Sequence, residues 1–132
     1  MRVLLDTHAL LWWLADERRL SQAQREAIES STRSGERLGL SVICFWEIAK
    51  LLERGRLRLP RSADQLFEEL ETHPELDVYP LTPRIALEST RLGPSFHSDP
   101  ADQIIAATAR VHGLRLVTAD DRIRRSGVVA FV

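Results

Sequence analysis

Arg2-Val3-Leu4-Leu5-Asp6-Thr7, at the start of the chain, joins a short apolar run to an acid and a hydroxyl residue. The apolar run is typical of a buried strand, and Thr7 is suited to cap a helix over 8–15. The pattern therefore predicts a strand that ends at Asp6, with a helix directly after it.

The rest of the chain repeats this alternation of strands and helices. Capping boxes begin at Ser21 and Ser62, and Thr82-Pro83 and Asp99-Pro100 each combine a cap residue with proline at the first helical position. Helices are predicted over 22–34, 42–54, 63–73, 83–92 and 101–112, a turn or short helix over 120–126, and strands over 38–40, 77–81, 114–118 and 128–132. This order predicts an α/β fold, a three-layer α/β/α arrangement with a mostly parallel central sheet.

Length and composition fit one domain over residues 1–132. The chain is 44% hydrophobic and 28% charged, and its formal net charge is −1. All but one of its 18 basic residues are arginine, the exception being Lys50. Arginine binds phosphate by paired hydrogen bonds, so two clusters are candidate nucleic-acid contacts, although such charge runs are more often solvated surface: Arg54, Arg56, Arg58 and Arg61, and Arg122, Arg124 and Arg125.

The compartment is predicted from the cysteine count and the chain start. Cys44 is the only cysteine, so an internal disulfide is excluded and a reducing compartment is expected. The apolar start is interrupted by Asp6 and His8 and is too short to span a bilayer. We therefore expect a cytoplasmic protein with no membrane partner.

Four acids are predicted at one edge of the sheet. Ligands of open parallel sheets bind beyond the carboxyl ends of the strands. Asp6 ends the first strand, Glu47 lies in the second turn after Ser41, Asp102 begins a helix, and Asp120 follows the strand that ends at Thr118.

Each acid also has a structural explanation. Asp6 is a suitable helix cap, Asp102 suits a helix dipole beside the cap Asp99, and Asp120 suits a turn. Glu47 is the least easily explained, because it shares a helix face with apolar residues. A pair with Lys50 would stabilise it by only a few tenths of a kcal/mol.

Converging carboxylates repel one another unless a cation neutralises them. All-oxygen ligation suits Mg²⁺ or Mn²⁺ better than zinc. Such ions activate water and stabilise the leaving oxygen in phosphodiester hydrolysis, so the acids predict a metal-dependent nuclease.

Four segments together resemble the PIN-domain ribonucleases, specifically the VapC-like toxins of bacterial toxin–antitoxin pairs: Leu4 to His8, Ser41 to Leu51, Asp99-Pro100-Ala101-Asp102 through Thr108, and Leu116 to Asp120. The resemblance covers nearly the whole chain. It implies a Mg²⁺- or Mn²⁺-dependent endoribonuclease, which acts on RNA and is held inactive by a VapB-like antitoxin.

Site residues follow from the same resemblance. It implies a catalytic and metal-binding quartet of Asp6, Glu47, Asp102 and Asp120, with Asp99 as an auxiliary acid and Thr118 in support. Asp6 and Asp102 are the expected direct metal ligands. Gln103 departs from the arginine that members often carry there, which puts one substrate or supporting contact in doubt.

An apolar surface favours a protein partner as well. The segment from His8 to Ala15 is apolar nearly all round, and Phe45-Trp46 adds to it. These side chains either belong to the core or form an exposed patch for an antitoxin helix or a second copy, and we expect a homodimer.

Other classes fit less well. An aspartate-nucleophile phosphatase needs a second aspartate where His8 stands, and a receiver domain needs a late lysine. A zinc site from His8, His73, His97 and His112 lacks short ligand spacings. The non-enzymatic alternative is a catalytically silent PIN-like module that binds RNA or protein.

Overall fold

A parallel sheet forms the centre of the molecule. In the computed structural model, which describes residues 2–132, the strands are β1 (Val3–Leu5), β2 (Leu38–Ser41), β3 (Leu76–Tyr79) and β4 (Arg115–Val117). Their order across the sheet is β3-β2-β1-β4, and every neighbouring pair is parallel. The α/β fold class predicted from the sequence is confirmed.

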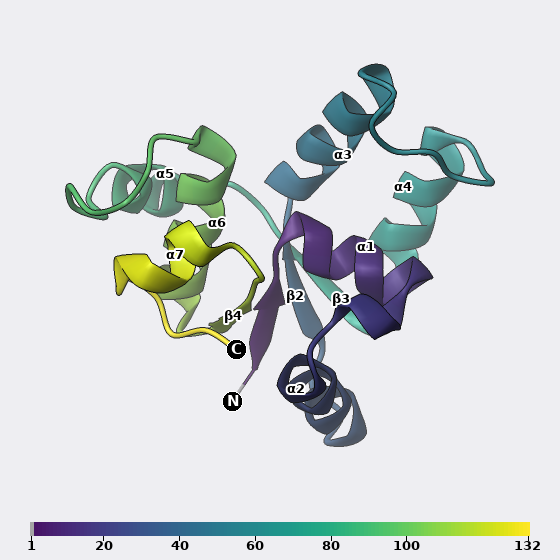
Figure 1. Ribbon diagram of the computed structural model, residues 1–132, viewed down its shortest axis with the longest axis horizontal. Helices are drawn as coiled ribbons and strands as arrows, with labels where there is room; N and C mark the ends of the chain where they lie inside the picture. Colours follow the sequence, from purple (N-terminus) through teal and green to yellow (C-terminus); the bar gives the residue numbers. More distant parts are fainter. Residues whose placement is uncertain (1) are drawn as a thin grey trace.

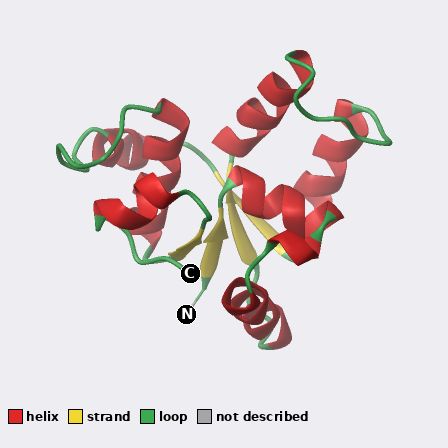
Figure 2. Ribbon diagram, in the orientation of Figure 1, coloured by secondary structure: helices red, strands yellow, loops and turns green. Residues whose placement is uncertain are grey.

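Helices cover both faces of this sheet. Figure 1 shows α1 to α4 on one side and α5 to α7 on the other, and Figure 2 shows the strands enclosed between them. Their bounds are α1 (Thr7–Ala15), α2 (Gln22–Arg33), α3 (Ile43–Glu53), α4 (Ala63–Thr72), α5 (Pro83–Ser89), α6 (Pro100–His112) and α7 (Asp121–Ser126), with a 3₁₀ turn, η1, at Glu17–Arg19. None of these helices is both long and apolar enough to cross a membrane.

The helix starts follow the capping signals in the sequence. Capping boxes form at Ser21 and Ser62, as predicted. The Asp99 side chain accepts a hydrogen bond from the Asp102 amide, and Pro100 occupies the first turn of α6. Gly113 ends α6 with a φ of 64°, a conformation that glycine adopts without steric cost.

Three sequence expectations need correction. Asp6, rather than Thr7, caps α1, because the Asp6 side chain accepts from the Ala9 amide. Helix α5 ends at Ser89 instead of continuing to residue 92. The predicted strand over 128–132 is a single bridge between Leu116 and Phe131, because only Leu116 of β4 exchanges hydrogen bonds with it, through Ala130 and Val132.

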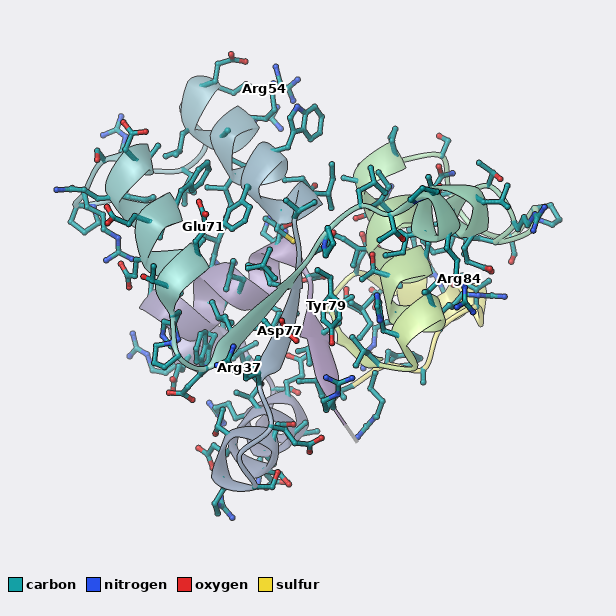
Figure 3. The ribbon with its side chains drawn as sticks, turned by 180° about the vertical axis from the view of Figure 1, so that it is seen from behind. Arg37, Arg54, Glu71, Asp77, Tyr79 and Arg84 are labelled. Carbon is teal, nitrogen blue, oxygen red and sulfur yellow. The ribbon has the colours of Figure 1, made fainter. Side chains whose placement is uncertain are left out.

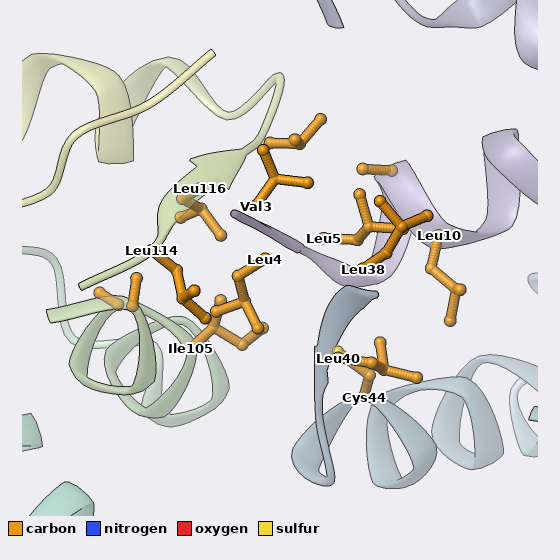
Figure 4. Packing of buried hydrophobic residues seen from close by; sticks show 14 of the residues in the cluster. Val3, Leu4, Leu5, Leu10, Leu38, Leu40, Cys44, Ile105, Leu114 and Leu116 are labelled. Carbon is orange, nitrogen blue, oxygen red and sulfur yellow. The ribbon is translucent and has the colours of Figure 1, made fainter. Parts of the chain in front are cut away.

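The core lies on both faces of the strands. Leu4 and Leu116 pack near Ile105 of α6, while Leu40 packs near Cys44 of α3 (Figure 4). All five side chains are fully buried. This packing fixes the starts of α3 and α6 above the carboxyl edge of the sheet.

Gly39 is the tightest point of the sheet. A Cβ added there would lie 2.9 Å from Cε2 of Tyr79 and 3.2 Å from the carbonyl oxygen of Val3. Tyr79 belongs to β3, the strand that pairs with the strand of Gly39, and is labelled in Figure 3.

We expect Gly39→Ala to destabilise the fold by about 1 to 3 kcal/mol, because the backbone oxygen cannot give way as a flexible side chain can. Urea unfolding of the variant and the wild type measures the difference. Equal unfolding midpoints would contradict this packing.

Candidate metal centre

A cavity of about 310 Å³ opens beyond the carboxyl ends of β1, β2 and β4. All five acids predicted from the sequence line it, together with residues that were not predicted there. Its lining comprises Asp6, Thr7, His8, Trp12, Glu47, Asp99, Asp102, Ala119, Asp120 and Arg122.

Asp6 lies at the junction of β1 and α1. Its amide donates to the Val117 carbonyl of β4, and its Oδ1 accepts from the Ala9 amide at 2.8 Å. The side chain is therefore held in place as a helix cap and is only 7% exposed. The structural explanation and the ligand role are compatible, because a carboxylate has more acceptor sites than its hydrogen bonds with the Ala9 amide and the Thr118 side chain use.

Glu47 is positioned by α3 and by a residue of α1. The Thr7 hydroxyl donates to its Oε1 at 2.5 Å. The sequence alternative for Glu47, a pair with Lys50, is wrong, since the Lys50 Nζ lies 3.3 Å from Glu53 instead. Thr7 thus has a role in the cavity that the sequence does not indicate.

Asp102 is held by a histidine. His97 Nε2 lies 2.6 Å from Asp102 Oδ2, and the His97 ring stacks on Phe96. Gln103 donates from its side-chain amide to the His97 carbonyl at 3.2 Å, which fixes the loop that carries the histidine. Gln103, the residue that departs from the family pattern, therefore supports Asp102 indirectly, through the loop of His97.

Asp120 has a basic partner in its own helix. Arg122 Nη2 lies 3.0 Å from Asp120 Oδ2 and 3.7 Å from Asp102 Oδ2. Thr118 accepts a hydrogen bond from the Asp120 amide at 3.0 Å and is fully buried, so it shapes the loop below the cavity. Arg122 is therefore a basic residue that faces two of the acids.

The acids differ in their pKa. Burial raises the pKa of Asp6, Glu47 and Asp102, and the charges of neighbouring acids raise them further. The pKa of Asp120 is lowered, although its partial burial alone would raise it, because its hydrogen bonds to Arg122 and the charge of that arginine more than offset burial. Three of the four acids therefore lack a full counter-charge within the protein.

These shifts predict a pH dependence of stability in EDTA. A carboxyl group whose pKa is higher in the folded than in the unfolded chain binds its proton more tightly when folded. The protonated carboxyl group therefore stabilises the fold at low pH. This stabilisation is lost as the pH rises from the pKa of the unfolded chain, about 4, through the pKa of the folded chain.

We therefore expect a lowering of the pH from neutral toward 4 to add a stabilising contribution in EDTA, which raises the thermal unfolding midpoint of the wild type. The rise should be smaller in Asp6→Asn, which cannot take up that proton but can still cap α1. An identical pH profile in the two proteins would contradict the raised pKa of Asp6.

Donor atoms from these residues come close enough to share a cation. Atoms of Glu47, Asp99 and Asp102 lie within 4.8 Å of one another, as do those of His97, Asp102 and Asp120. Asp102 belongs to both groups, and Asp6 faces the same cavity. A set dominated by carboxylate oxygens suits Mg²⁺ or Mn²⁺.

The histidines do not assemble a zinc site among the described residues. The His73 ring packs at a tilt against Trp13, and the His112 ring packs at a tilt against Tyr79.

The family model of the PIN domain matches residues 3–128 of the chain. The chain belongs to the PIN-domain family. A curated relative, Ribonuclease VapC22 of Mycobacterium tuberculosis (strain ATCC 25618 / H37Rv), is 39% identical over 92% of this chain and 89% of its own length. The family resemblance inferred from the sequence is confirmed.

Solved structures of PIN-domain relatives share the fold. The chain matches a protein in the crystal structure of VapBC2 from Rickettsia felis bound to a DNA fragment from their promoter, with a TM-score of 0.72, 14% identity and coverage of 100% of this chain and 98% of that one. A toxin–antitoxin complex from Klebsiella pneumoniae matches with a TM-score of 0.64, 21% identity and coverage of 98% and 95%.

Besides Thr7, sequence reasoning missed His97 and Arg122 as contacts of the acids. His97 lies in a loop, where no periodicity gives its direction. Arg122 is two residues after Asp120 and reaches it only because α7 begins there. No sequence pattern indicates the contact of His97 with Asp102 or that of Arg122 with Asp120.

The apolar segment of α1 is mostly accounted for by packing. Leu10 is buried, whereas Leu11, Trp12, Trp13 and Leu14 are partly buried against the core. Trp46 differs from them because 54% of its surface is exposed.

Proposed function

We propose that this chain is a Mg²⁺- or Mn²⁺-dependent endoribonuclease toxin of the VapC type. The observation that carries the proposal is the gathering of five carboxylates around one cavity of a PIN-domain chain. Its relationship to a curated ribonuclease at 39% identity supports RNA as the substrate.

Asp6, Glu47, Asp102 and Asp120 are the proposed metal-binding and catalytic residues, with Asp99 as an auxiliary acid and Thr118 in support. A divalent cation bound there would activate water and stabilise charge on the scissile phosphate. Thr7 orients Glu47, and His97 orients Asp102. Arg122 offers a positive charge at the cavity rim beside Asp120 and Asp102.

A neutralising partner belongs to the same proposal. Solved relatives of matching fold come from toxin–antitoxin complexes, and we propose a VapB-like antitoxin for this chain as well. We also propose that the toxin forms a homodimer and acts in the cytoplasm. The burial of Cys44, the lone cysteine, is consistent with a reducing compartment.

The function is tested by incubating the purified chain with total cellular RNA in Mg²⁺, in Mn²⁺ and in EDTA. We expect discrete fragments with either ion and none in EDTA, and mapping of the cut ends gives the substrate. Intact RNA with both ions would favour the catalytically silent binding module instead.

A further inference from the structure

A second hollow adjoins the acid-lined cavity. It has a volume of about 210 Å³ and lies along α3. Thr7, His8, Glu47 and Asp99 line both spaces, so the two lie side by side. The additional lining residues of the second hollow are Trp46, Lys50, Leu51, Arg54 and Pro100.

Three of these residues form a stripe on α3. Trp46, Lys50 and Arg54 are spaced four residues apart, which places them on one face of the helix. The stripe begins next to Glu47 and ends at Arg54, which lies at the outer end of α3 (Figure 3). It therefore leads away from the acids along the surface.

Trp46 is the most exposed large apolar side chain in the described part of the chain, at 54%. Burial in the core does not explain its position, unlike those of Trp12 and Trp13. The Lys50 ammonium lies 5.9 Å from the centre of its ring, so a cation stands beside an open aromatic face.

An exposed indole beside two cations has the chemistry of a nucleotide site. Bases of single-stranded nucleic acid stack on aromatic side chains, while lysine and arginine contact the phosphates. The strand bearing the scissile phosphate must also leave the acid-lined cavity, and the adjoining hollow along α3 offers it a place to bind.

We infer that Trp46, Lys50 and Arg54 form a subsite for single-stranded RNA, with a base next to the cleavage point stacked on Trp46 and the following phosphates on Lys50 and Arg54. This inference rests on the proposed ribonuclease function and adds the place where a flanking nucleotide binds.

The charges favour RNA over a second copy of the chain as the occupant. Tryptophan and arginine are common at protein interfaces, but lysine is depleted at their centre, and here Lys50 lies over the exposed ring. Phosphate can pair with Arg54, which makes no ion pair with any acid in residues 2–132, and can compete for Lys50, whose partner Glu53 is 67% exposed. Such an exposed pair is weak and readily exchanged.

The test measures binding in the full-length Asp102→Asn background, so that the probe is not cut. The probe is a fluorescently labelled pool of random-sequence, 12-nucleotide single-stranded RNA, and anisotropy gives the affinity. We expect Trp46→Ala to weaken binding by roughly 5- to 100-fold and Trp46→Phe to restore most of the loss. Lys50→Ala and Arg54→Ala should each reduce the salt dependence of binding by about one ion.

Matched controls come from the opposite side of the sheet and from α2. Leu87 on α5 is 50% exposed, and Arg33 on α2 is a surface arginine paired with Glu29. Leu87→Ala and Arg33→Ala should bind the RNA pool as the background protein does.

Failure of this inference is distinguishable from failure of the function. If the otherwise wild-type chain cuts RNA with metal but Trp46→Ala leaves affinity and KM unchanged, the subsite is wrong and the nuclease stands. An oligomer that dissociates in Trp46→Ala with unchanged RNA affinity assigns this face to a second copy and also overturns the subsite. A raised KM with an unaltered kcat supports it.

Discussion

Replacing Asp102 with asparagine should reduce RNA cleavage by more than about a hundredfold. Mutation of a residue that only hydrogen-bonds to a metal ligand typically lowers activity 10- to 100-fold, and loss of a ligand itself should lower it further. Asp102 belongs to both groups of donor atoms in the cavity. Asparagine keeps the shape of the side chain and can still accept a hydrogen bond from His97, so the fold should persist. Initial cleavage rates at saturating Mn²⁺ measure the effect.

Asp121→Asn is the matched control for Asp102→Asn. Asp121 is an exposed acid in the first turn of α7, next to Asp120 but outside the cavity lining. Its replacement removes the same charge and should leave cleavage within about twofold of wild type. An Asp102→Asn chain that cuts as fast as the control would remove Asp102 from the catalytic set.

Replacing Asp6 with asparagine should have opposite effects with and without metal. In EDTA the variant should unfold at a temperature several degrees higher than wild type, because a buried carboxylate with a raised pKa is removed while the cap on Ala9 is kept. Excess Mn²⁺ should then stabilise the wild type and stabilise the variant much less.

Differential scanning calorimetry at neutral pH, with EDTA and with Mn²⁺, checks both effects in one series. Asp77→Asn serves as a control, because Asp77 lies on β3 and does not line the cavity. Equal stabilisation of Asp6→Asn and wild type by Mn²⁺ would exclude Asp6 as a ligand.

Local signals allowed most of the fold to be predicted from the sequence. Two capping boxes and Asp99-Pro100 gave correct helix starts, because these residues satisfy backbone groups within their own turn. The segment 128–132 was mispredicted as a strand because its apolar pattern does not reveal how little of β4 is available for pairing.

The gathering of the acids was predictable for a related reason. Parallel strands deliver their carboxyl ends to one edge, so Asp6 and Asp120 had to approach the starts of α3 and α6. The contacts that orient them were not predictable, because Thr7 meets Glu47 across 40 positions of sequence and His97 reaches Asp102 from an irregular loop. Such pairs depend on how α1, α3 and α6 pack together.

The most direct test of the metal centre is the anomalous scattering of Mn²⁺ in crystals of the full chain. We predict a manganese peak in the acid-lined cavity, about 2.1 Å from carboxylate oxygens of Asp6 and Asp102. Crystals that hold Mn²⁺ only at surface sites, with none between these two carboxylates, would contradict it.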